Sequence, residues 1–150
     1  MNGWQWFKQV VNVVNLTTPA GLLVAGAGRA KLSRGPRGLF LATGYRLGFP
    51  IAGAFTIGNV VLTKHDRGYF DRNPQLVLHE ERHSWQYLIL IGAPFLPLYG
   101  IAAGWSWLRT GDFASRNMFE RLAGLVDGGY EEHQPRSLVA ALRSLRRSAQ

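Results

Sequence analysis

The sequence predicts a mostly helical α+β domain, in which a short antiparallel sheet or hairpin precedes a helix that carries two histidines. Residues 4–16 repeat apolar side chains with a helical period, and residues 39–45 and 54–63 are rich in β-branched and aromatic residues. Residues 79–83 read His-Glu-Glu-Arg-His within a second helical pattern. With 150 residues, 47% of them hydrophobic, the chain can bury one core, so we expect a single domain over residues 1–150.

The first segment, residues 1–35, predicts a basic, amphipathic and helical N-terminal region. Apolar residues at positions 4, 7, 10, 11 and 14 fall on one face of a helix over 4–16. Thr18 can cap a second helix, with Pro19 at its first position and its end near Lys31. The Gly-Pro-Arg-Gly run at 35–38 predicts a turn.

The central segment, residues 36–130, is the predicted core of the domain. Residues 39–45 and 54–63 favour two strands in hairpin-like order, and 64–74 predicts a polar loop. Asn73 and Pro74 can start the histidine helix, which Gly92 and Pro94 end.

The stretch from Tyr87 to Leu108 has 22 residues without a charge. Glycines and prolines interrupt it, so we expect a buried helical hairpin rather than a membrane span. A helix capped at Ser115 or Asn117 should follow and stop at Gly128. Residues 131–150 predict a basic C-terminal helix.

The charges are unevenly placed. Residues 1–65 contain seven basic residues and no acid, residues 66–133 contain nine acids and six arginines, and the rest adds four arginines, which together give the net +8. Both ends therefore favour an anionic partner. Because Trp4, Trp6 and Phe7 stand among valines, an anionic membrane surface fits better than nucleic acid. We expect a cytoplasmic protein, peripheral to the inner face of the membrane.

The His79-Glu80-x-x-His83 spacing predicts a metal site. On a helix both rings lie on one face, one turn apart, and can reach one zinc ion, while Glu80 can act as general base toward a water molecule. The chain has no cysteine, so imidazole and carboxylate must bind the metal. Glu120, on a separate predicted helix, is the candidate third ligand, and Gln86 shares the histidine face.

Four elements in this order resemble the small bacterial H-E-x-x-H proteins related to gluzincin metallopeptidases. They are the Thr-Ile-Gly-Asn strand at 56–59, the helix from His79 to Gln86, the segment from Gly92 to Tyr99, and the Asn-x-Phe-Glu helix at 117–120. The resemblance implies a zincin-like α+β fold, zinc on His79, His83 and Glu120, and Glu80 as general base. It also implies that the strand at 54–63 borders a cleft and pairs with an extended peptide or protein substrate. Asn117 and Tyr130 are further candidates to line the cleft or to hold the metal ligands in place.

Glu81 and Arg82 depart from that pattern, since active gluzincins usually have uncharged residues there. We expect these charges to reach solvent or to find partners. Three hypotheses follow: a zinc-dependent metallohydrolase, most simply a peptidase; a non-catalytic, membrane-associated scaffold or partner subunit with a structural or vestigial metal site; and a binder of anionic surfaces or nucleic acid with a coincidental motif. Iron or manganese would also suit two histidines and a carboxylate.

Overall fold

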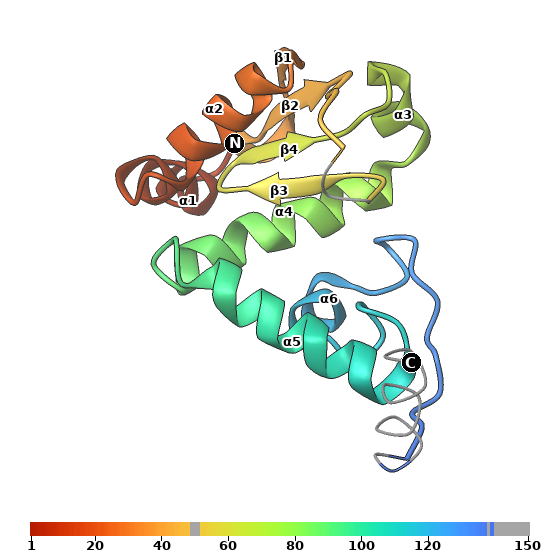
Figure 1. Ribbon diagram of the computed structural model, residues 1–150. Coiled ribbons are helices and arrows are strands. Elements are labelled where there is room, and N and C mark those ends of the chain that lie inside the picture. The colour runs from red at the N-terminus through yellow and green to blue at the C-terminus, as the bar shows by residue number, and fades with distance from the viewer. Residues whose placement is uncertain (49–51, 138, 140–150) are drawn as a thin grey trace. The chain divides into compact units, whose positions relative to one another are not determined.

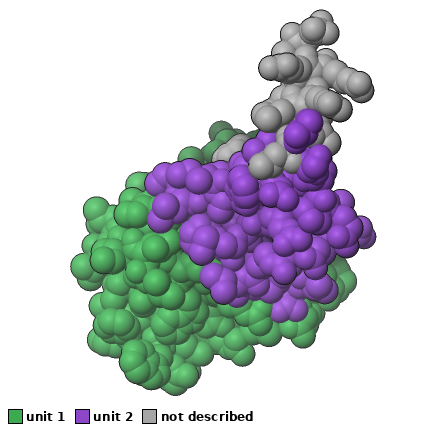
Figure 2. Space-filling model, turned by 90° about the horizontal axis from the view of Figure 1, so that it is seen from below, with its two compact units in different colours: residues 1–95 green, residues 96–150 purple. Residues whose placement is uncertain are grey.

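The computed structural model describes residues 1–48, 52–137 and 139 (Figure 1). The chain divides into two compact units, residues 1–95 and residues 96–150, which Figure 2 colours separately. The α+β prediction is confirmed. The elements are α1 (Gly3–Val14), α2 (Thr17–Ala27), β1 (Lys31–Arg34), η1 (Pro36–Gly38), β2 (Phe40–Thr43), β3 (Phe55–Ile57), β4 (Val60–Leu62), α3 (Arg67–Arg72), α4 (Pro74–Ile89), α5 (Phe95–Thr110) and α6 (Met118–Ala123).

The first unit contains a four-stranded mixed sheet in the order β1-β2-β4-β3 (Figure 1). β1 and β2 are antiparallel, β2 and β4 are parallel with Leu41 opposite Val61, and β4 and β3 are antiparallel. The single strand predicted over residues 54–63 is wrong, because these residues form the β3–β4 hairpin. The predicted hairpin between the two β-rich segments is also wrong, since they meet in parallel.

Apolar residues on alternate positions of the central strands bury both faces of this sheet, as the two-residue repeat of a strand requires. One face packs against α3 and α4 in a cluster made of Leu39, Leu41, Ala54, Val61, Phe70, Leu76 and Val77. The opposite face packs against α2 in a cluster made of Ala25, Ala42, Tyr45, Val60 and Leu62. The sheet is thereby fixed between α2 and the histidine helix α4.

Three local predictions are wrong. Thr18 is not the cap of α2: its hydroxyl accepts from the Asn59 side chain at 2.8 Å, and Leu16 occupies the cap with φ 67°. Residues 31–34 are a strand rather than the end of a helix. The predicted loop over 64–74 contains α3, whose cap Asp66 accepts from the backbone N–H of Tyr69 at 3.1 Å.

A buried polar network joins α1, the β3–β4 turn and α4. The Asn12 amide donates to Asn59 Oδ1 at 3.1 Å and to the Ser84 carbonyl at 2.9 Å, and the Ser84 hydroxyl donates to Asn59 Oδ1 at 2.8 Å. Asn12, Asn59 and Ser84 are all fully buried. Because unpaired buried polar groups are costly, this network fixes which face of α1 points inward.

The β3–β4 turn lies close to the start of α2. Gly58 adopts φ 61°, a conformation that side chains disfavour. A β carbon at Gly58 would also lie 2.4 Å from the backbone nitrogen of Thr18. The turn therefore requires glycine for both reasons.

The second unit contains α5 and α6. Leu96, Ile101 and Trp105 on α5 are exposed, so the expected burial of this stretch is wrong for these side chains. Asn117 caps α6 and accepts from the Phe119 N–H at 3.0 Å, and the helix ends at Gly124, earlier than predicted. Residues 131–137 are not helical, and most of the predicted C-terminal helix lies outside the described residues.

Candidate metal centre

The histidine helix forms where the sequence predicts it, with Pro74 at its first position and sixteen residues to Ile89. His79 and His83 are both buried. Their Nε2 atoms are 3.0 Å apart, and their rings are nearly perpendicular, at 84°. The one-turn spacing thus turns two imidazole nitrogens toward the same point.

Gln86 orients the second of these rings. The Nδ1 atom of His83 lies 2.8 Å from Gln86 Oε1. An amide oxygen can only accept a hydrogen bond, so Nδ1 carries the proton and Nε2 offers its lone pair. This is the arrangement in which a second polar group fixes a metal-binding histidine.

The spacing of the two Nε2 atoms fits a zinc ion. Two nitrogens at the usual zinc distance in a tetrahedral site are about 3.3 Å apart. The observed 3.0 Å is close to that value without any movement of the helix. The pair therefore offers half of a tetrahedral ligand set.

Glu80 directly follows His79 on α4, and its side chain is held by the sheet. Its Oε2 accepts from the hydroxyl of Thr56 on β3 at 2.7 Å, and the same hydroxyl is 3.3 Å from the Glu80 carbonyl. The carboxylate is buried, with 3% of the residue exposed. Thr56 therefore sets the position of the candidate general base.

Tyr87 provides a test of the environment around Glu80. It is fully buried, and its hydroxyl has no hydrogen-bond partner among the described residues. Burial raises the pKa of Tyr87 from its ordinary value of 10.0, and the negative charge of Glu80 adds to that rise. The folded chain therefore keeps this proton at a pH where the unfolded chain loses it.

We expect the wild-type protein to lose roughly 1 kcal/mol of stability near pH 11, relative to a Tyr87→Phe variant. A raised folded-state pKa gives stability that is complete below pH 10 and falls as the pH rises further, and phenylalanine has no such proton. Urea unfolding of both proteins near pH 8 and near pH 11 measures the difference. A gap that is equal at both pH values would contradict the assignment.

Glu81 has two cationic partners, as its place inside the motif led us to expect. Its carboxylate lies 3.4 Å from Lys8 Nζ and 2.8 Å from an Arg37 guanidinium nitrogen. Lys8 is fully buried, and its ammonium lies 5.4 Å from the centre of the Trp85 ring. Burial lowers the pKa of Lys8, and the Glu81 carboxylate opposes that change. Arg82 is half-buried.

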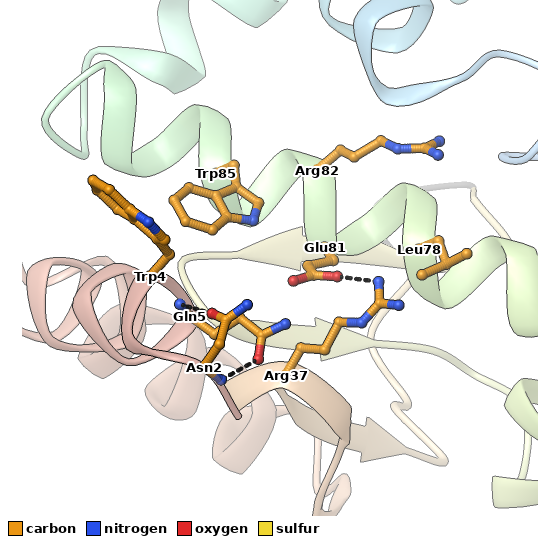
Figure 3. A pocket seen from close by; sticks show the side chains of 8 residues that line it. All are labelled: Asn2, Trp4, Gln5, Arg37, Leu78, Glu81, Arg82 and Trp85. Atoms are coloured by element: carbon orange, nitrogen blue, oxygen red, sulfur yellow. Dashed lines mark hydrogen bonds and ion pairs between the residues drawn. The ribbon is translucent and has the colours of Figure 1, made fainter.

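A cavity of about 350 Å³ lies on the side of α4 that carries Glu81 and Trp85 (Figure 3). The start of α1 and Arg37 form its other walls, and the Glu81–Arg37 ion pair lies within it. Neither His79 nor His83 lines this cavity. It is therefore separate from the candidate metal ligands.

In the second unit, Glu120 lies in the first turn of α6 and is buried, with 2% exposed. It accepts a short hydrogen bond from the hydroxyl of Tyr99 on α5. Asn117 is fully buried and caps this helix through its side-chain oxygen. Tyr130 is half-buried in the segment after α6, and its backbone N–H donates to the Leu125 carbonyl at 3.1 Å.

Three residues near these groups have roles that the sequence did not reveal: Thr56, Tyr99 and Lys8. Thr56 and Tyr99 lie in the segments that carry the resemblance to gluzincin-related proteins, but the resemblance assigns neither residue a role. Lys8 lies outside the apolar positions of the predicted helix over 4–16, and no partner was predicted for it. Their contacts join residues 24, 21 and 73 positions apart, which no local pattern encodes.

Comparison with protein families, with curated proteins and with solved structures finds no match to this chain. The resemblance to gluzincin-related proteins stays a prediction.

Proposed function

We propose that the protein is a small zinc-dependent hydrolase, most simply a peptidase. His79, His83 and Glu120 would bind the metal, and Glu80 would act as general base. The observation that carries this proposal is the 3.0 Å separation of the two histidine Nε2 atoms, with His83 oriented by Gln86. A zinc ion held there would supply Lewis acidity to a water molecule and to a scissile carbonyl group.

Glu120 is proposed as the third ligand, contributed by the second unit. It supplies a carboxylate, which is the ligand type that a chain without cysteine must use beside histidine. His79, His83 and Glu120 are each buried, and each offers one atom of a type that binds zinc. The Tyr99 hydroxyl would restrain the Glu120 carboxylate, as outer partners of metal ligands do.

The chain's own residues would then divide the work of hydrolysis. Glu80 would accept the proton of the attacking water and pass it to the leaving amine. Thr56 would keep the Glu80 carboxylate beside the histidines through the 2.7 Å hydrogen bond. Gln86 would keep the His83 proton on Nδ1.

The position of β3 supports a peptide as the substrate class. β3 is an edge strand of the sheet and carries Thr56. An extended peptide could add to this edge by main-chain hydrogen bonds. Such a peptide would run beside the residue that holds the proposed base.

Metal analysis tests the proposal. We expect one zinc ion per wild-type chain and none in the His79→Ala, His83→Ala double variant. Glu120→Ala should lower zinc affinity by about tenfold or more, because one ligand of three is lost. Elemental analysis of the purified protein, which also detects iron and manganese, and zinc titration by calorimetry after chelation measure both effects.

Two matched variants serve as controls. His65→Ala removes an exposed histidine that stacks on Tyr69, and Glu131→Ala removes an exposed carboxylate. Neither should change zinc content or affinity. Zinc retained by the double histidine variant, or a wild-type chain that binds no transition metal, would overturn the proposal.

The burial of Glu80 and its hydrogen bond to Thr56 favour one alternative, in which the metal stabilises the fold of a non-catalytic scaffold or partner subunit. In that case a zinc concentration about a hundredfold above Kd would stabilise the protein by about 2.7 kcal/mol without any turnover. A melting temperature that is the same with and without chelator would reject this alternative.

A further inference from the structure

Helix α1 points its apolar side chains outward. Its outward face consists of Trp4, Trp6, Phe7, Val10, Val13 and Val14. The most exposed of these are Trp4 at 72% and Val14 at 73%, whereas Lys8 and Asn12 on the same helix are fully buried. This is the reverse of the arrangement that a helix on the surface of a water-soluble domain usually has.

Buried polar contacts maintain this orientation. Lys8 pairs with Glu81, and Asn12 bonds to Asn59 and Ser84. Rotating the helix to hide its tryptophans would expose these contacts and leave Glu81 without its buried cation. The exposed face is thus a stable feature of the fold.

The apolar surface extends beyond α1. Leu16, between the two helices, and Leu23, on α2, are exposed at 68% and 76%. Between residues 3 and 27 the only charged residue is Lys8, which is buried. Many exposed apolar side chains in a segment without an exposed charge mark a site of interaction.

The basic residues in this part of the chain indicate the kind of partner. Residues 1–65 contain seven basic residues and no acid. Arg29, Lys31 and Arg34, which directly follow α2, are all exposed. A partner that combines an apolar interior with negative surface charge matches both features.

We propose that the outward face of α1 docks into the headgroup region of a lipid bilayer that contains anionic phospholipids. The helix would lie in the plane of the surface, because its 12 residues extend about 18 Å, less than the bilayer core. Tryptophan is the residue that prefers this interfacial depth. A second copy of the chain is disfavoured as the occupant, since it would bring two basic, acid-free segments together.

The lengths of the helices are consistent with a position at the membrane surface. Within the described residues no single helix is long and apolar enough to cross a membrane. α1 and α2 would be long enough only as a pair, and they are bent by 72° at their junction. An interfacial helix requires neither a longer segment nor a straight junction.

Vesicle flotation tests this proposal with the full-length chain. We expect wild-type protein to float with phosphatidylcholine vesicles that contain about one third phosphatidylglycerol, to bind neutral vesicles at least about tenfold more weakly, and to lose binding as salt rises. The Trp4→Gln, Trp6→Gln double variant should bind anionic vesicles about tenfold more weakly or worse, because both side chains are exposed in the free protein. Should that variant misfold, Val14→Gln with Leu23→Gln gives the same test.

The matched control is Leu122→Gln with Val126→Gln. These residues are also exposed apolar side chains, at 69% and 82%, but they belong to the second unit. The control should bind vesicles like wild type. Equal binding to neutral and anionic vesicles, or no binding to either, would overturn the proposal. A dimer in light scattering that the tryptophan variant dissociates, with no vesicle binding, would instead identify a second copy as the occupant.

Discussion

Under the proposed hydrolase mechanism, replacing Glu80 with glutamine is expected to lower the rate of peptide hydrolysis by about 10²–10⁴-fold while the proposed zinc ion stays bound. Glutamine has nearly the same shape, and its amide oxygen can still accept the hydrogen bond from the Thr56 hydroxyl, which measures 2.7 Å in the native chain. An amide cannot take a proton from water near neutral pH, so only the general-base step is lost. Mass spectrometry of a mixed peptide library, incubated with the zinc-loaded proteins, measures the rate.

The control for this experiment is Glu131→Gln, which removes an exposed carboxylate of the same type. It should cleave the library like wild type. If Glu80→Gln retains the wild-type rate, Glu80 is not the base. If wild-type protein binds zinc and cleaves nothing, the non-catalytic alternative is favoured instead.

Replacing Glu81 with alanine is expected to destabilise the fold by about 3–5 kcal/mol. The change leaves Lys8 buried without its carboxylate, and Lys8 has no exposed surface on which to rehydrate. Arg37 suffers less, because 47% of its side chain is exposed. Urea unfolding, followed by circular dichroism, measures the loss.

Two variants test the cause of that loss. Lys8→Met combined with Glu81→Leu removes both charges and should recover most of the stability, because the uncompensated buried charge is gone. Glu132→Ala breaks the exposed ion pair with Arg121 and should have little effect. If Glu81→Ala proves as stable as Glu132→Ala, the buried pair does not stabilise the fold.

Helices α1 and α4 were the most predictable elements of the fold. Residues 4–16 and 74–90 have strong helical periods, and α1 and α4 form there. The sheet was predicted less well. The single strand over 54–63 disregards the Gly58-Asn59 pair, which is a two-residue hairpin signal between Phe55–Ile57 and Val60–Leu62. The parallel pairing of β2 with β4 depends on contacts between distant strands, which local composition does not encode.

The candidate site, like the fold, was predictable only in part. The four-residue spacing of His79 and His83 is sufficient to predict that they share a helix face. The Thr56 contact with Glu80 could not be predicted, because it requires the sheet to pack on α4. The apolar period of α1 predicts an amphipathic helix but not which face points inward, and here the partners of Lys8 and Asn12 decide it.

The turn at Gly58 links the start of α2 to the position of Glu80. Any larger residue there would force the hairpin away from the Thr18 backbone, 2.4 Å from where a β carbon would stand. Thr56, two residues earlier on the same hairpin, would shift with it and loosen its hold on the Glu80 carboxylate. Residue 58 touches none of the residues of the proposed active site, so a substitution there would affect the proposed catalysis only by displacing Thr56 and, through it, Glu80.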